Sequence, residues 1–387
     1  MTLPPYAVPA SWPDFSLYRP HPAAATLRES IADTRAQSWA WLGDLSGAAA
    51  LGPRHALLNP PQWEVGHLAW FWEKWLLREG DIARCPSALL ANTDALYDSA
   101  TVAQDTRWEV ALLPWTAAWQ YLDAVLARVS QRLTREPLTD ALAYFTQLCV
   151  FHQDMHNEAF AIRRQMLGDF PMAIGLKALA GAGSKDHAME KSMDIGFPAG
   201  VHKQGAAPRS GFVFDNEKWA HDVAHAAFAI ASHPVTQGEY AAFLDAGNAA
   251  HAPATWRRRG SWEQRVFDTW QPLAADAPVV HVNALQAGAY CVWAGRRLPS
   301  ETEWEAAQPQ LHGQGVVWEW TATSFAPYPG FSADPYEEYS APWYSGAFRV
   351  LRGGSVATAP RNLRRTWRNF YTPSRADMFC GFRTCAL

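Results

Sequence analysis

The sequence predicts an α+β protein of two domains, a four-helix bundle followed by a loop-rich domain of short segments. The chain has 387 residues, which is more than one hydrophobic core usually serves. Apolar residues recur with a helical period as far as about residue 167. After Gly168 the chain becomes rich in Gly, Ala and Pro and loses that period. We therefore expect the boundary at about 170–190, with domains at 1–175 and 190–387.

The composition favours a soluble cytoplasmic protein without nucleic-acid or membrane partners. The net charge of -4 gives no reason to expect nucleic acid or an anionic membrane. Five scattered cysteines without a CxxC pair favour free thiols in a reducing compartment. The first 16 residues lack the basic and apolar regions of a signal peptide, and no apolar run is long enough to span a bilayer. The 20 tryptophans predict a well-packed core or an aromatic-lined pocket.

The first two helices of the bundle are predicted before residue 80. The first covers about 24–44, and its apolar side is expected to carry Leu27, Ile31, Trp39 and Leu42. The second runs to about Arg78, with Asn59 as N-cap and prolines in its first turn. His67 lies among apolar residues on this helix. A long loop, roughly 80–107, follows it.

The remaining two helices are predicted at about 115–133 and 138–167. The last one contains His152 and His156, which are four residues apart and therefore lie on one helix face. Both share the apolar stripe with Leu142, Phe145, Cys149 and Ala159. Inward-facing imidazoles need partners for their nitrogens. The pair therefore indicates either a metal site, as bundle cores often hold, or two core histidines bonded to backbone or carboxylate groups.

Helix signals also occur in the C-terminal domain. One helix is predicted from about Asn283, and another from Ser300, where Glu303 completes a capping box. Trp318 and Trp320 are expected in the core.

Several C-terminal motifs together resemble the formylglycine-generating-enzyme-type domain, a C-type-lectin-like fold. They are Val235-Thr236-Gln237-Gly238-Glu239-Tyr240, Gly295-Arg296-Arg297-Leu298-Pro299-Ser300-Glu301-Thr302-Glu303-Trp304-Glu305, Val317-Trp318-Glu319-Trp320-Thr321, Leu351-Arg352-Gly353-Gly354-Ser355 and Gly381-Phe382-Arg383. The N-terminal half, with Gly66-His67 and His152-x-x-x-His156, is similar to a DinB-type helical bundle. This fusion resembles the ergothioneine-pathway sulfoxide synthases and their selenium counterparts, the selenoneine synthases.

The resemblance implies a metal centre and a reaction. In that family three histidines, matching His67, His152 and His156, hold a mononuclear non-haem iron(II). The enzymes use O2 to join sulfur or selenium to the imidazole C2 of hercynine, with formation of a sulfoxide or selenoxide. Neutral imidazole suits iron(II), and three protein ligands leave coordination positions open. The same three ligands suit zinc, so the residues alone leave both metals open.

The resemblance also implies catalytic and binding residues. The family's catalytic tyrosine, a proton donor, matches Tyr336, with Tyr339 as the second candidate. Asn369 and Phe370 match the hercynine site, and Arg375 matches an arginine that binds the donor's carboxylate.

One further basic residue belongs to the bundle's own loop. Arg107 is expected either to reach the substrate pocket or to form a surface salt bridge.

Two positions depart from the pattern of the thiol-using enzymes. Tyr371 replaces an aspartate that pairs with the ammonium group of gamma-glutamylcysteine, and Met155 replaces a glutamine before the second helical histidine. Loss of that acid should weaken binding of the thiol peptide by about 1–3 kcal/mol. An aromatic side chain suits the apolar face of a sugar. The resemblance to the selenium branch of the family, which uses a selenosugar, therefore implies a selenosugar donor, with gamma-glutamylcysteine or cysteine as the alternative.

Three other functions remain open. Copper-dependent formylglycine formation needs a cysteine pair, but Cys380 and Cys385 are five apart in one expected strand and would lie on opposite faces. A zinc-dependent thiol transferase would need no O2. A lectin-like binding module would leave the three histidines without a role.

Overall fold

The computed structural model describes residues 13–78, 88–170 and 192–387. The chain divides into two compact units, which we describe separately. The first comprises residues 1–160, 208–212 and 334–338, and the second comprises residues 161–207, 213–333 and 339–387. The expected domain boundary at about 170–190 falls mainly outside the described residues. No described helix has the length and apolar character needed to cross a membrane.

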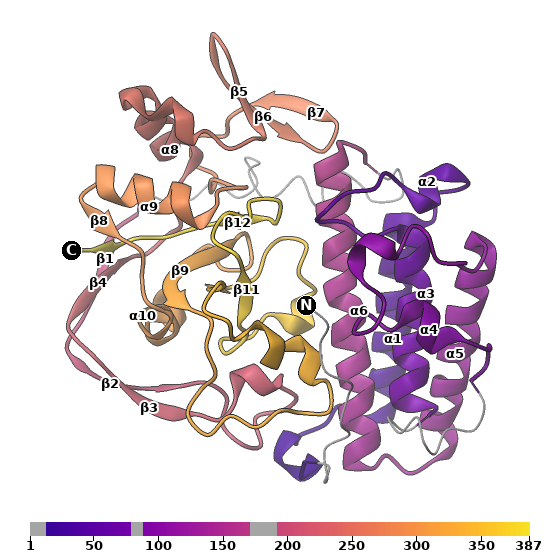
Figure 1. Ribbon diagram of the computed structural model, residues 1–387. Helices are drawn as coiled ribbons and strands as arrows, with labels where there is room; N and C mark the ends of the chain where they lie inside the picture. The colour runs from indigo at the N-terminus through magenta and orange to yellow at the C-terminus, as the bar shows by residue number, and fades with distance from the viewer. Residues whose placement is uncertain (1–12, 79–87, 171–191) are drawn as a thin grey trace. The chain divides into compact units, whose positions relative to one another are not determined.

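The first unit is a helical bundle (Figure 1). Its elements are η1 (Phe15–Tyr18), α1 (Ala24–Leu42), α2 (Ala48–Leu51), α3 (Pro61–Leu76), α4 (Thr93–Tyr97), η3 (Gln104–Thr106), α5 (Trp115–Arg135) and the first three-quarters of α6 (Asp140–Leu167). Helix α3 is buried along almost its whole length and packs against α5 and α4. The four long helices agree with the prediction. The expected loop also contains the short helices α4 and η3.

Two local predictions in the bundle were wrong. Trp39 was expected on the apolar side of α1, but 47% of its surface is exposed. The buried positions include Thr34 and Ser38, because both bond to Asn157 of α6. Asn59 does not cap α3, which begins at Pro61 without a side-chain cap.

The second unit combines short strands and helices, so the molecule is α+β as predicted. Its helices are α8 (Gln237–Phe243), α9 (Ala284–Trp293) and α10 (Glu301–Ala307), with the π-helical η6 (Leu244–Asn248) and the 3-10 segments η5 (Asp215–Glu217), η7 (Ala249–His251), η8 (Gln308–Gln310), η10 (Ala341–Trp343) and η11 (Pro360–Asn362). A further 3-10 turn, η9, spans Glu337–Tyr339. The helix expected from about Asn283 is α9, which the Asn283 side chain caps, and Ser300 caps α10 as its capping box predicted.

The described strands of this unit form four small sheets. Two have four strands, in the orders β1-β4-β13-β8 and β11-β10-β9-β12, and the others have the orders β2-β3 and β5-β6-β7 (Figure 1). The strands are β1 (Asp194–Phe197), β2 (Gly200–Gln204), β3 (His221–His225), β4 (Phe228–Ala231), β5 (Trp256–Arg259), β6 (Ser261–Val266), β7 (Thr269–Pro272), β8 (Arg296–Arg297), β9 (Trp318–Ser324), β10 (Arg349–Arg352), β11 (Asn369–Tyr371), β12 (Cys380–Gly381) and β13 (Cys385–Ala386).

The core of the second unit contains both tryptophans of β9 and several ion pairs. Trp318 and Trp320 are buried, as predicted. Arg383 donates to both carboxylate oxygens of Glu319 at 2.5 and 2.7 Å, and neither side chain is exposed. A buried charge is tolerated only when it is paired, so loss of either side chain would leave the other charge uncompensated in this core.

The cysteines are placed differently from the prediction. Cys380 and Cys385 do not share a strand, because β12 and β13 belong to two different sheets. Cys149, Cys291, Cys380 and Cys385 are all free and buried. Cys85 lies outside the described residues. The expected strand geometry, with the two cysteines on opposite faces of one strand, is therefore wrong.

Candidate metal centre

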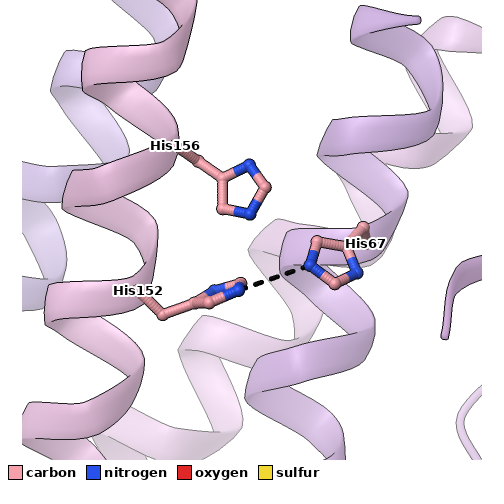
Figure 2. A group of neighbouring side chains, drawn as sticks. All are labelled: His67, His152 and His156. Atoms are coloured by element: carbon pink, nitrogen blue, oxygen red, sulfur yellow. Dashed lines mark hydrogen bonds between the residues drawn. The ribbon is translucent and has the colours of Figure 1, made fainter. Parts of the chain in front are cut away.

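Three histidines from two helices of the bundle point toward one another (Figure 2). His67 lies on α3, and His152 and His156 lie one turn apart on α6. One nitrogen from each forms a group whose members lie within 4.8 Å of one another. The Nε2 atoms of His67 and His152 are 3.3 Å apart. Two nitrogens bound at about 2.1 Å to one ion would be roughly 3.0–3.4 Å apart, so this spacing fits a shared metal.

Contacts on the outer side of two of the rings orient them. His67 donates from Nδ1 to the backbone carbonyl of Tyr97 at 2.8 Å, which leaves Nε2 free to bind a metal. The Nδ1 atom of His156 lies 3.3 Å from Oε1 of Glu64, whose side chain is buried. Such outer partners fix the tautomer and the orientation of a ligating imidazole.

His152 is held by stacking instead. Its ring lies parallel to that of Phe71, with centroids 3.6 Å apart and planes inclined by 6°. Its Nδ1 is buried and has no hydrogen-bond partner in the described parts of the chain. The position of this ring is therefore set by packing on α3.

Burial favours the neutral form of two of the three histidines. Removal from water holds the pKa of His67 well below its ordinary value, and the nearby His156 adds to the effect. The same two causes, with His67 as a further neighbour, lower the pKa of His152. A neutral imidazole has a lone pair for a metal, so the set fits a divalent ion that prefers nitrogen ligands.

A chain of polar contacts continues outward from Glu64. Its Oε1 accepts from Nδ2 of Asn59 at 3.4 Å, and Oδ1 of Asn59 accepts from Arg107 at 2.8 Å. The guanidinium of Arg107 also donates to the backbone carbonyls of Ser99 and Val102 and lies 3.8 Å from the ring centre of Trp63. Trp63 in turn stacks on His67, with ring centres 4.8 Å apart.

These contacts define the surroundings of Arg107. The side chain is buried, and burial lowers its pKa to about 10. The surface salt bridge considered from the sequence is therefore wrong. Arg107 instead contacts Trp63, the ring that stacks on His67.

The two candidate tyrosines have different surroundings. Tyr336 belongs to the first unit, where its ring contacts Phe71 and His152 edge-on at centroid distances of 4.9 and 5.7 Å. Tyr339 belongs to the second unit and packs against Phe214 and Phe370. Tyr336 is therefore the one that contacts a candidate metal ligand.

The predicted substrate residues of the second unit lie on and after β11. Asn369, Phe370 and Tyr371 form this strand, which pairs with β10. Phe370 stacks on Phe325, with centroids 3.9 Å apart. In the turn that follows, Arg375 pairs with Asp377 through two contacts of 2.5 Å and lies 5.0 Å from the ring centre of Tyr371. Met155, in the first unit, is half-buried on α6 beside His156.

Some residues around the centre were not predicted. Glu64 precedes His67 by three residues, and this helical spacing could have indicated a shared face. Phe71 follows His67 by four residues and has the same signal. The contact between Tyr18 and Asp334, which is described below, could not be predicted from helical spacing, because the two residues are 316 positions apart in the sequence.

Comparisons with known proteins identify the family. A family described as "Sulfatase-modifying factor enzyme 1-like domain" matches residues 182–314 and 310–386. Hercynine oxygenase of Mycobacterium tuberculosis is 31% identical over 392 residues, which span 84% of this chain and 91% of that protein. The chain belongs to the hercynine oxygenase family. Hercynine oxygenase of Mycolicibacterium thermoresistibile is 29% identical across 94% of this chain and 95% of its own length. Ergothioneine biosynthesis protein 1 of Schizosaccharomyces pombe is 28% identical over 211 residues, which cover 44% of this chain and 27% of that protein.

Proposed function

We propose that this protein is a non-haem iron(II) enzyme that uses O2 to join the selenium of a selenosugar to the imidazole C2 of hercynine, forming a selenoxide. The observation that carries the proposal is the group of three inward-facing histidines with Tyr336 packed against His152. The names of the hercynine oxygenase relatives support hercynine as the acceptor substrate. Iron(II) held by three imidazoles supplies open coordination positions for O2 and for a soft donor atom.

The residues of the chain have separate tasks in this proposal. His67, His152 and His156 bind the metal. Tyr336 is the proton donor, acting from its phenol oxygen, because it is the candidate tyrosine that packs on a ligand. The aromatic rings beside His67 and His152 limit the access of water to the centre. Asn369 and Phe370 are proposed to contact hercynine.

The charge balance around Tyr371 supports a neutral donor. Arg375 is paired with Asp377, so its charge is already compensated inside the chain. Tyr371 places a phenol ring where the thiol-using pattern has a carboxylate, and this ring also faces the Arg375 guanidinium. A sugar can stack on such a ring and needs neither a free cation nor a free anion. The alternative donors, gamma-glutamylcysteine and cysteine, carry an ammonium group that finds no matching acid at Tyr371.

A donor comparison tests the proposal. The iron-loaded protein is supplied with O2, hercynine and either a selenosugar, gamma-glutamylcysteine or cysteine, and the coupled product is measured. We expect the highest kcat/KM with the selenosugar. A higher value with a thiol would instead support the alternative, a sulfoxide synthase of the ergothioneine type.

A pair of variants makes the comparison sharper. Tyr371→Asp should improve kcat/KM for gamma-glutamylcysteine by about tenfold to a hundredfold, since a charged hydrogen bond contributes about 1.5–3 kcal/mol. Tyr371→Asn, which removes the ring without adding charge, should lower turnover of the selenosugar without this gain. Equal effects of the two variants would show that charge at this position does not select the donor.

A further inference from the structure

The N-terminal segment of the chain contacts the segment that carries Tyr336. Tyr18 ends the 3-10 helix η1 and is completely buried. Its hydroxyl lies 2.7 and 2.8 Å from the two carboxylate oxygens of Asp334, which is also buried. Both residues belong to the first unit. A hydrogen bond to a buried carboxylate is among the stronger neutral-to-charged contacts in proteins.

Several contacts hold Tyr18 in place. The side chain of Asp14 accepts from the backbone N–H of Ser16 and caps η1. The ring of Tyr18 packs edge-on against Tyr144 of α6, with centroids 4.7 Å apart. The backbone carbonyl of Arg19 accepts from the N–H of Gly211 at 3.0 Å. Tyr18 is thus fixed on the bundle independently of Asp334.

Asp334 begins the short segment 334–338. This segment belongs to the first unit, whereas the residues before and after it in the sequence belong to the second. Pro335, which is buried, separates Asp334 from Tyr336. Proline has a fixed φ, so a constraint on Asp334 is passed to Tyr336 with little freedom. At the other end of the segment, Glu338 interacts electrostatically with Lys74 of α3.

We propose that Tyr18 is a positioning residue that holds Tyr336 against His152 through the bond to Asp334. The bond fixes one end of the 334–338 segment on the bundle, and the segment directs the Tyr336 ring at the histidine. The catalytic consequence rests on the proposed function, but the positioning itself does not.

Hydrogen–deuterium exchange on the full chain tests the positioning directly. Tyr18→Phe keeps the ring and removes the hydroxyl. We expect the amides of residues 336–338 to exchange about tenfold faster or more, while amides of α6 near His152 are unchanged. Arg19→Ala is the matched control, because it removes an adjacent pair with Asp140 in which the Arg19 side chain is 60% exposed. The control should leave exchange in 336–338 unchanged.

The inference is overturned if Tyr18→Phe leaves exchange in 336–338 unchanged, or if exchange rises equally throughout the bundle. Asp334→Asn provides a second variant that keeps the shape of the side chain while weakening the acceptor. It should raise exchange in the same three residues, and no rise would overturn the inference as well.

A kinetic test then addresses the catalytic consequence. Tyr18→Phe should lower kcat at unchanged metal affinity, and it should lower kcat little further in a Tyr336→Phe background. Independent effects of the two substitutions would contradict positioning. If the unaltered protein shows no turnover of hercynine, the proposed function fails, but the exchange experiment still decides the positioning.

Discussion

The contact between Glu64 and His156 predicts that a residue outside the ligand set controls metal affinity. Glu64 is 4% exposed, and its Oε1 lies 3.3 Å from Nδ1 of His156. Removing an outer partner of a ligating imidazole typically weakens metal binding by about 10–100-fold. This corresponds to about 1.4–2.7 kcal/mol. We therefore expect Glu64→Ala to raise the metal Kd by about 10–100-fold, and Glu64→Gln, which keeps an acceptor, to raise it less.

The assay is an anaerobic titration of the metal-free protein with Fe(II) against a competing chelator. Glu73→Gln is the matched control. Glu73 is on the same helix and 1% exposed, but it bonds to Tyr121 and to the backbone N–H of Leu89 rather than to a candidate ligand. We expect this control to lower stability without changing the metal Kd. An unchanged Kd in Glu64→Ala, or an equal rise in Glu73→Gln, would refute the reasoning.

Three further predictions follow from the same structure. His152→Ala should reduce bound iron from about one per chain to near zero and abolish the rise in Tm on metal addition, as measured by metal analysis and thermal unfolding. Tyr336→Phe should lower kcat and leave the metal Kd unchanged; a matching loss of metal would contradict its role as proton donor. Burial lowers the pKa of His281 to about 4. Between about pH 6.5 and pH 4 the unfolded chain therefore binds a proton that the folded chain does not. As the pH is lowered through this range, the free energy of unfolding should decrease by up to about 3 kcal/mol. His281→Gln should remove that part of the pH dependence in urea titrations.

The features that were predicted correctly depend on short stretches of chain. The four-residue spacing of His152 and His156 gives their shared helix face, and the capping box at Ser300 gives the start of α10. Each of these follows from the geometry of a single helix turn. The third candidate ligand, His67, came from family resemblance, because its approach to α6 depends on helix packing.

The features that were missed depend on contacts between distant segments. Trp39 was placed on the apolar side of α1 from the helical pattern of apolar residues, but Thr34 and Ser38 occupy that side through bonds to Asn157. Asn59 is of a residue type that is favoured at N-caps, yet its side-chain amide bonds to Glu64 and Arg107 instead. In both cases a specific polar partner overrides a local propensity. The partners Asn157 and Arg107 lie 119 and 48 residues from Ser38 and Asn59, so no pattern within one segment reveals them.

We propose that His67, His152 and His156 form an iron site at which O2 is used to join hercynine to its donor. The most direct measurement combines iron analysis of the purified protein with O2 uptake in the presence of hercynine and a donor. We expect about one iron per chain and O2 consumption that requires both substrates and is lost in His152→Ala. Full turnover without O2, or activity retained with zinc in place of iron, would contradict the claim.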